Sequence, residues 1–195
     1  MEQTRDIGER QTRCIPGDFK TRKAEDGNEY IEGYFAVFGE DYEIWPGATE
    51  SIDRHAFDNA LDDDIRCLTD HDTRLVLGRN VANTLELSVD EHGLYGRVLV
   101  NPNDQDAKNT KARVDRRDVT QASFGFDILD EETEYRDDGS IHWTIKEVKL
   151  YEVSVCTFPA YKETNLQARH ADKDAFDQRR LDAWKEEQRR RLKNA

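Results

Sequence analysis

The chain has 195 residues, of which 36% are hydrophobic and 36% are charged, and its mean hydropathy is −0.95. Its formal net charge is −13 with an isoelectric point near 4.9, which argues against nucleic acid and against an anionic membrane surface as partners. It contains no apolar run of about 18 residues, and its first residues lack the apolar segment of a signal peptide. We therefore expect no membrane association and a location in the cytoplasm of the cell that makes the protein.

The three cysteines, Cys14, Cys67 and Cys156, lie far apart and form no CxxC motif. This spacing predicts neither a zinc site nor a disulfide framework. Each cysteine is expected to sit in the fold as a small apolar residue. We expect no metal and no cofactor.

Composition divides the chain into three parts. Residues 1–12 are polar and are expected to form a flexible N-terminus, and residues 13–167 are expected to form one β domain. Residues 168–195 form a charged tail. Its segment 171–195 has eight Lys or Arg, six Asp or Glu and no Gly or Pro, which predicts a helix with a thin apolar stripe. Such a helix is either solvated or a segment for docking or removal.

The first half of the domain reads as strands, a loop and a helix. Residues 13–38 predict two strands joined at the Asp-Gly turn of "EDGN", and residues 39–50 predict a loop punctuated by Pro and Gly. The segment "SIDRHAFDNALDD" (51–63) has apolar residues on one helical face and predicts a helix.

The middle of the domain alternates short strands with one helix. Strands are predicted at residues 65–68 and 74–80, and two more flank the "DEHG" turn within residues 84–100. A short helix is predicted over residues 105–116. Further strands are predicted between residues 119 and 158. Because the strands are short and form no regular βαβ series, we expect a closed or nearly closed antiparallel barrel of about six to eight strands with peripheral helices.

The stretch "VTQASFGFDIL" (119–129) carries a small hydroxyl, Ser123, on a strand between bulky neighbours. Gly125 weakens the strand and marks a close approach by a backbone or a ligand. A nucleophilic serine needs a base and a group that orients the base. Phe124 and Gly125 are the residues expected beside a bound substrate.

A histidine is the best base near neutral pH, and the chain has five: His55, His71, His92, His142 and His170. His71 stands out because it follows a short apolar strand in "IRCLTDHDTRLVLG", where the chain turns between strands.

For the orienting carboxylate, alternation along "IKEVKLYEVSVCTFPAY" predicts that Glu152 shares one mostly apolar face with Val148, Leu150, Ser154 and Cys156. A carboxylate on such a face needs a partner. Glu147, on the opposite face, and Asp72 are the alternatives. No spacing rule makes a triad of these residues, so residue types alone leave the assignment open.

At these residues the sequence resembles a known family, the prohead (procapsid maturation) serine proteases of tailed bacteriophages. Six blocks match in the family's order over about residues 31–165: "IEGYFAVFGE", "HAFDNAL", "RCLTDHDTRLVLGR", "DEHGLYGRVLV", "DVTQASFGF" and "EVKLYEVSVCTFPAY". The chain departs from the family pattern beside the candidate positions, with Thr69-Asp70 before the histidine and Gln121-Ala122 before the serine.

The resemblance implies a herpesvirus-assemblin-like β-barrel flanked by helices. It implies an endopeptidase that cuts scaffold and major capsid protein segments, and often itself, inside the assembling procapsid in the host cytoplasm. His71 would be the general base and Ser123 the nucleophile, with Glu152 (or Glu147) as third member. A homo-oligomer without nucleic acid or membrane partners is expected by analogy. The alternative is a catalytically inactive structural protein of the same fold that forms phage rings or tubes.

Overall fold

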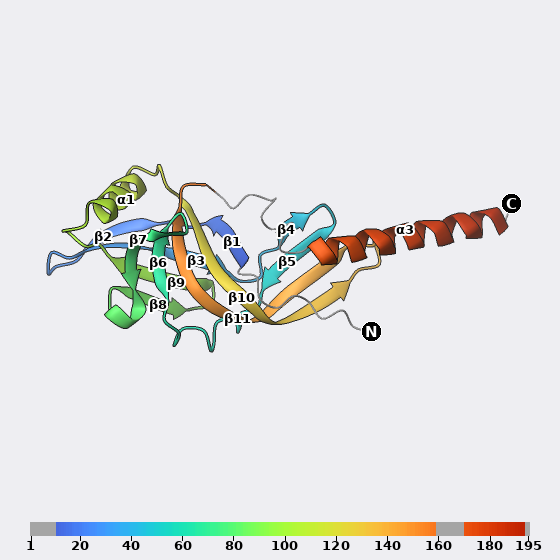
Figure 1. Cartoon of the computed structure of the whole chain (residues 1–195), viewed down its shortest axis with the longest axis horizontal. Coiled ribbons are helices and arrows are strands. Elements are labelled where there is room, and N and C mark those ends of the chain that lie inside the picture. The colour runs from blue at the N-terminus through green and yellow to red at the C-terminus, as the bar shows by residue number, and fades with distance from the viewer. Residues whose placement is uncertain (1–10, 159–169, 194–195) are drawn as a thin grey trace.

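The structure is a computed structural model that describes residues 11–158 and 170–193. Its strands form a seven-stranded sheet and a four-stranded sheet. The seven-stranded sheet has the order β1-β10-β11-β5-β4, with β6 pairing a second part of β11 and β7 pairing β6. The four-stranded sheet has the order β2-β3-β9-β8. Figure 1 shows β10 and β11 as long strands that extend from the middle of the body to the end that carries β4 and β5.

The strands have the following bounds: β1 Gln11–Pro16, β2 Lys20–Lys23, β3 Glu29–Val37, β4 Tyr42–Trp45, β5 Ala48–Ile52, β6 Arg66–Thr69, β7 Asp72–Arg79, β8 Leu85–Val89, β9 Gly93–Leu99, β10 Gln121–Tyr135 and β11 Ile141–Cys156. The helices are the short 3₁₀ helix η1 (Asn80–Ala82), α1 (Gln105–Asp115) and α3 (His170–Lys193).

The prediction of a mainly β protein with peripheral helices is confirmed, but the predicted closed antiparallel barrel is wrong. Within the described residues no ladder joins the two sheets. In addition, β11 pairs in parallel with both β5 and β6, one along each part of its length. One strand with two successive neighbours on the same edge branches the sheet, which a simple closed ladder does not do. Strand pairing over such long sequence separations cannot be read from local alternation.

The main core lies between the two sheets. It is formed by the buried apolar side chains of the four-stranded sheet, such as Ile31 and Leu94, packed on those of the long strands, such as Phe124, Phe126 and Val153. The opposite face of the seven-stranded sheet is therefore left for other groups, and it carries the candidate site.

Three local predictions for the first half of the chain are wrong. Residues 13–38 contain parts of three strands, because β1 leaves the expected hairpin and pairs with β10. The predicted loop at 39–50 holds the hairpin β4–β5. Residues 54–62 form successive turns in place of a helix, with i→i+3 bonds such as Ala60 N to Phe57 O. Ala56, Phe57 and Ala60 are buried as the pattern predicts and Leu61 is partly buried, but so short a helix is marginal and tertiary packing decides its form.

The second half of the chain agrees more closely with the elements predicted from the sequence. The strands around "DEHG" are β8 and β9, and the predicted helix at 105–116 is α1, which begins after the N-cap Asp104. The Asp104 side chain accepts hydrogen bonds from the backbone N–H groups of Asp106 and Ala107. Between residues 119 and 158 the chain forms two long strands where three shorter ones were predicted.

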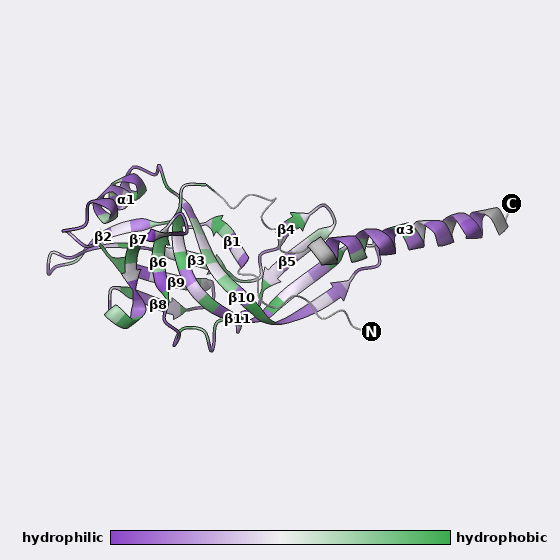
Figure 2. Ribbon diagram, viewed as in Figure 1, coloured by the Kyte–Doolittle hydropathy of each residue, from purple (hydrophilic) through white to green (hydrophobic). Residues whose placement is uncertain are grey.

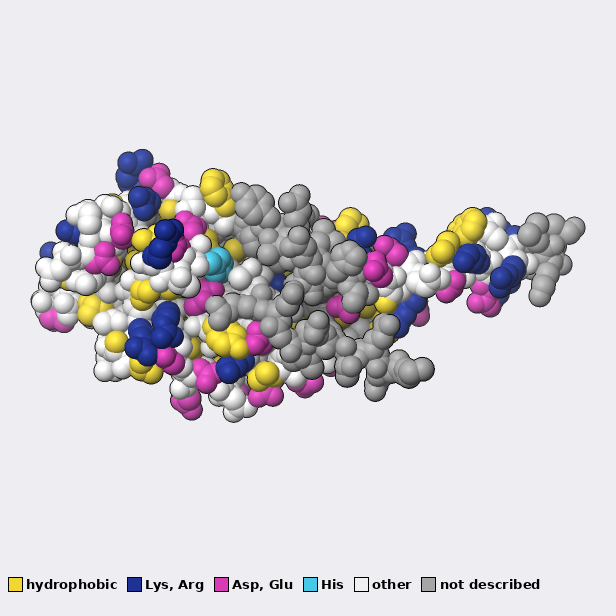
Figure 3. Space-filling model, in the orientation of Figure 1, with side chains coloured by type: hydrophobic (Ala, Val, Ile, Leu, Met, Phe, Trp, Pro, Cys, Tyr) yellow, Lys and Arg dark blue, Asp and Glu magenta, His cyan; other side chains and the backbone are white. Residues whose placement is uncertain are grey.

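The predicted tail helix is α3, which projects from the end of the sheet that carries β4 and β5 (Figure 1). Phe176 anchors it: this side chain is buried, packs on Trp45 with ring centroids 6.0 Å apart, and completes a second small core. The rest of α3 is mostly hydrophilic (Figure 2), and acidic and basic side chains intermix along it (Figure 3). None of the described helices is both long and apolar enough to cross a membrane.

A buried ion pair ties β1 to β5. Arg13 and Glu50 are 1% and 0% exposed, and the guanidinium donates to both carboxylate oxygens, with Nη2 2.9 Å from Oε2. Removing one partner of such a pair leaves an uncompensated buried charge.

We expect Glu50→Ala to lower the free energy of unfolding by about 3–5 kcal/mol. Urea denaturation followed by circular dichroism measures the loss. The double variant Arg13→Met/Glu50→Leu is the matched control and should lose much less, because no charge is stranded. Equal losses in the two variants would show that packing, and not charge pairing, holds β1 to β5.

Candidate active site

A tight hairpin turn between β6 and β7 holds His71. Thr69 and Asp72 are paired in the ladder, so Asp70 and His71 are the two central residues of the turn. Both have positive φ, 51° and 58°, as a type I′ turn requires. Asp and His are among the few residues besides glycine and asparagine that adopt this conformation readily. The Asp70 carboxylate accepts hydrogen bonds from Thr157 N (2.6 Å) and Oγ1 (2.8 Å), which pins the turn to the end of β11.

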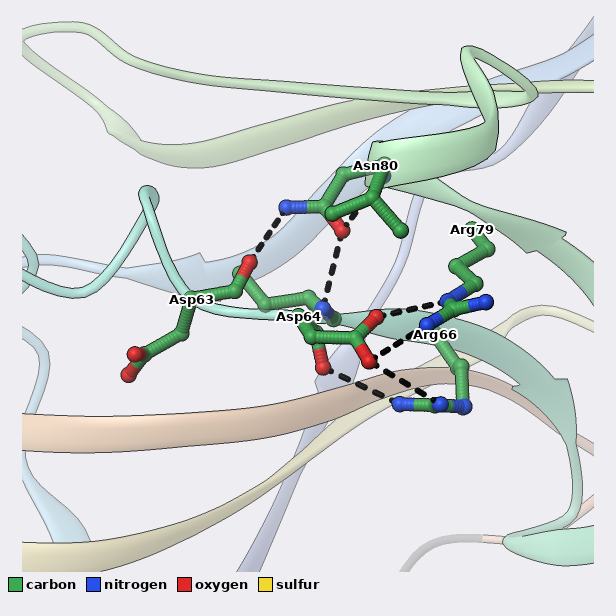
Figure 4. A network of polar contacts seen from close by, with 7 residues as sticks. Asp63, Asp64, Arg66, Arg79 and Asn80 are labelled. Atoms are coloured by element: carbon green, nitrogen blue, oxygen red, sulfur yellow. Dashed lines mark hydrogen bonds and ion pairs between the residues drawn. The ribbon is translucent and has the colours of Figure 1, made fainter.

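A polar network fixes the other end of the same hairpin (Figure 4). The Asn80 side chain accepts a hydrogen bond from Ile65 N (2.9 Å) and donates one to Asp63 O (2.6 Å). Arg79 and Arg66 both bind the Asp64 carboxylate, and the hydrogen bond from Arg79 is the main cause that lowers the pKa of Asp64 to about 2. The hairpin that carries His71 is thus held at its base as well as at its tip.

Glu152 and His71 are joined directly. His71 Nδ1 lies 2.7 Å from Glu152 Oε1, and the carboxylate side chain is only 6% exposed. Ser154 Oγ donates to Glu152 Oε2 (2.5 Å) and accepts a hydrogen bond from His71 N (3.3 Å). Ser154, which the sequence did not indicate as a site residue, therefore fixes both the carboxylate and the backbone of the histidine.

A β-bulge in β11 turns Glu152 toward His71. Gly125 pairs with Glu152, whereas Phe126 pairs with Leu150, so one residue of β11 is left over. Leu150 and Val153 consequently share the core face with the stacked rings of Phe124 and Phe126. The prediction that Leu150 and Glu152 lie on one face is wrong, because the extra residue reverses the alternation. The bulge takes the carboxylate out of the core, where it has polar partners.

Ser123 lies at the centre of this face. It is directly opposite Cys14 on one side and Ser154 on the other. Facing residues on neighbouring strands have Cβ atoms about 4.5–5.5 Å apart, so Ser123 neighbours the serine that holds Glu152 and His71. Ser123 is 0% exposed, and both its Oγ and His71 Nε2 are buried atoms without a hydrogen-bond partner in the part of the chain that the structure describes.

Gly125 makes room for Glu152. A Cβ atom at this position would lie 2.3 Å from Glu152 Oε1. The close approach predicted from the glycine is thus an approach by the carboxylate. The Phe124 side chain is 0% exposed and stacks on Phe126 in the core, and its predicted place beside a substrate stays a prediction.

The alternative carboxylates lie elsewhere. Glu147 Oε1 accepts a hydrogen bond from Asn59 Nδ2 at 3.2 Å, and Asp72 pairs with Arg74 at 2.7 Å.

Three of the other histidines are also outside the site. His55 pairs with Asp58, the His92 ring packs on Tyr34, and His142 is bound by two hydroxyl groups. The side chain of His170 lies outside the described part of the chain. Of the five histidines, the structure brings His71 to the candidate carboxylate.

The surroundings of His71 favour its protonated form. Burial lowers the pKa of the imidazole, but the neighbouring Cys14 thiol, the hydrogen bond to Glu152 and the charge of Glu152 outweigh this effect and raise the pKa to about 9. The site thus holds a buried carboxylate, an imidazole whose Nδ1 the carboxylate binds, and a serine hydroxyl on the adjoining strand. This set of groups matches the nucleophile, base and orienting acid of a hydrolytic triad.

We expect Gly125→Ala to slow the reaction of the site about 100-fold, because the new methyl group must push the Glu152 carboxylate away from His71. The kcat/KM for a peptide substrate measures the loss, and circular dichroism checks the fold. Leu129→Ala, at an exposed position of the same strand, is the control and should keep the wild-type rate. A Gly125→Ala protein with unchanged kcat/KM would show that the position of Glu152 does not limit the reaction.

Comparison with known proteins agrees with the resemblance seen in the sequence. The family model of the caudovirus prohead serine proteases matches residues 17–179. The prohead protease of Enterobacteria phage HK97 is 31% identical over 148 residues, which cover 73% of this chain and 61% of that protein, so the chain spans about three-fifths of the relative's length. Among solved structures, the capsid assembly protease of bacteriophage T4 aligns with a TM-score of 0.48 and 11% identity over 76% of this chain and 97% of that chain.

Proposed function

Because the chain belongs to the caudovirus prohead serine protease family, we propose that it is a serine endopeptidase of procapsid maturation, with Ser123, His71 and Glu152 as its catalytic triad. One observation carries the assignment of residues. The His71–Glu152 pair leaves Nε2 of the imidazole buried and unpartnered on the face where Ser123 Oγ is also buried and unpartnered. Buried polar atoms without partners are rare in native proteins and call for an explanation, of which catalysis is one.

In this mechanism Ser123 Oγ attacks the carbonyl carbon of the scissile peptide bond. His71 Nε2 accepts the hydroxyl proton and later delivers it to the leaving amine. Glu152 holds Nδ1–H, which fixes the tautomer and stabilises the imidazolium that forms. Ser154 in turn holds Glu152. A water molecule then hydrolyses the acyl-enzyme by the same proton transfers in reverse.

The burial of Ser123 restricts how a substrate peptide can reach it. Ser123 is fully buried and the His71 side chain is 30% exposed. For a peptide to reach Ser123 Oγ, the surface over it would have to open. Nucleophile and base need only approach within hydrogen-bond distance when substrate binds.

The proposed substrates are the scaffold protein and the major capsid protein of the same phage, cut inside the assembling procapsid. Self-cleavage in the tail and a homo-oligomeric active form belong to the same proposal and are supported by the family resemblance alone. The rival role, a structural ring- or tube-forming subunit, receives no support from the matches, because the family and the HK97 relative are proteases by name.

Co-expression with the scaffold and capsid proteins tests the proposal. Wild-type enzyme is expected to convert both proteins into discrete fragments, whose masses and termini are read by mass spectrometry. The Ser123→Ala variant, which lacks the proposed nucleophile, is the control. Intact scaffold and capsid proteins in normally formed shells would contradict the protease assignment and favour a structural role.

A further inference from the structure

Two cysteines meet the candidate base in space although they are far from it in sequence. Cys14 Sγ, Cys156 Sγ and a ring nitrogen of His71 all lie within 4.8 Å of one another. Cys14 comes from β1, Cys156 from the end of β11 and His71 from the β6–β7 turn. Sequence spacing could not reveal this group, because its three members are separated by 57 and 85 residues, from position 14 to 71 and from 71 to 156.

The geometry excludes a disulfide between the two thiols. Cys14 and Cys156 pair with opposite sides of β10, at Ser123 and Gln121. Their Cα atoms are thus at least two strand spacings apart, about 9 Å or more, which exceeds the limit of about 7 Å for a disulfide. The two cysteine side chains reach toward each other over β10, the strand that carries Ser123. A third atom that binds both sulfurs is needed to link them.

The group has the chemistry of a zinc site. Two cysteine sulfurs and one imidazole are donors that zinc prefers, and tetrahedral zinc with bonds of about 2.0–2.3 Å needs donor atoms about 3.5–3.8 Å apart. Donor atoms 4.8 Å apart therefore have to close in by about 1.0–1.3 Å. Glu152 already binds His71 Nδ1, which leaves Nε2 for a ligand. A carboxylate behind the histidine is the usual second-shell support of a zinc ligand.

We propose that Cys14, Cys156 and His71 Nε2 bind Zn²⁺, and that the bound ion holds the protease inactive. The two thiols release their protons to solvent on binding, and the fourth position is left to water. The inhibitory half rests on the proposed function, because it requires His71 to be the catalytic base. One nitrogen cannot hold a zinc ion and also accept the proton of Ser123, so binding and catalysis exclude each other.

Cobalt spectroscopy tests the binding half without any substrate. The full chain, reduced with a phosphine, is titrated with Co²⁺. One equivalent should bring a thiolate-to-cobalt charge-transfer band in the near ultraviolet and the visible bands of a tetrahedral ion, and Zn²⁺ should displace it. Cys14→Ser and Cys156→Ser should each weaken binding at least about tenfold and reduce the thiolate band.

The third cysteine supplies a matched control. Cys67 is fully buried in the main core, away from the group, so Cys67→Ala should keep the complete cobalt spectrum. Circular dichroism checks the folding of each variant. If Cys156→Ser does not fold, Cys14→Ser carries the test, because Cys14 is only half-buried. The absence of a thiolate band, or a band that survives in both serine variants, would overturn the site.

Peptide cleavage tests the inhibitory half. One equivalent of Zn²⁺ should stop cleavage by the wild-type protein, and a chelator should restore it. With each rate normalised to the same protein without metal, Cys14→Ser should need at least about tenfold more zinc for the same inhibition. Zinc binding without inhibition would overturn the inhibitory half. A protein that shows the cobalt bands but cleaves nothing after chelation would refute the proposed function and leave the metal site supported.

Discussion

A Ser123→Ala protein is expected to cleave its substrate about 10⁴–10⁶-fold more slowly than the wild type and to be as stable. The loss of rate follows from the proposed role of the hydroxyl, which forms the bond to the substrate carbonyl. The residual rate would come from substrate binding and from whatever groups stabilise the oxyanion. Mass spectrometry of scaffold and capsid fragments over time measures the rate.

The unchanged stability is a separate expectation with its own reason. The Ser123 hydroxyl is buried, and within the described residues it has no hydrogen-bond partner. Folding therefore costs this group its hydration without a compensating bond, and the alanine variant avoids that cost. Urea denaturation should give a free energy of unfolding equal to the wild type or higher by up to about 1 kcal/mol.

Ser154→Ala is the matched control, since it removes a buried serine hydroxyl from the facing position of the next strand. That hydroxyl donates a hydrogen bond to Glu152 (2.5 Å) and accepts one from His71 N. Its loss should lower the free energy of unfolding by about 1.5–3 kcal/mol. The rate should fall no more than about 100-fold, because Glu152 Oε1 still reaches His71. The two serines are thus expected to give opposite results: Ser123 affects mainly the rate and Ser154 mainly the stability.

Cleavage that survives in Ser123→Ala would refute this serine as the nucleophile. Cys14 would then be the next residue to replace, because its thiol lies opposite Ser123 and beside His71. A Ser123→Ala protein that is destabilised by several kcal/mol would mean that the hydroxyl has a structural partner in the folded chain.

Local sequence patterns predicted the elements whose formation depends on neighbours in the chain. The α1 helix has its cap, Asp104, beside it, and β8 and β9 meet across the short turn that ends at Gly93. The pairing of β1 with β10, by contrast, joins residues more than a hundred positions apart. Nothing local distinguishes that partner from another strand, and so the sheet arrangement was not predictable.

The candidate site was also predicted only in part from the sequence. The resemblance indicated His71, Ser123 and Glu152, and the structure brings His71 to Glu152. The bulge in β11 was not predicted, although the carboxylate reaches the histidine only because of it. Alternation assumes a regular ladder, and a single extra residue inverts every face assignment beyond it. Ser154 and Cys14 were also missed, since a serine and a cysteine carry no signal until the strand register is known.

The second large effect is expected from Glu152→Gln, which should reduce kcat about 10³–10⁴-fold. The amide keeps the shape of the carboxylate, but it can turn its NH₂ group toward His71 Nδ1 and so favour the wrong tautomer. It also no longer stabilises the imidazolium. Glu147→Gln is the control on the same strand and should keep the wild-type rate, because Glu147 binds Asn59 and not the histidine.

The pH dependence separates Glu152 from a merely structural residue. Only neutral His71 accepts the serine proton, and its pKa is raised to about 9, so kcat/KM of the wild type should rise with pH until about pH 9. Glu152→Gln removes a hydrogen bond and a charge that both raise this pKa. The rising limb of its profile should therefore move to lower pH, toward the ordinary histidine value of about 6.5. A destabilised but otherwise normal site would lose rate at every pH without moving the limb. A profile unmoved in Glu152→Gln but shifted in Glu147→Gln would transfer the orienting role to Glu147.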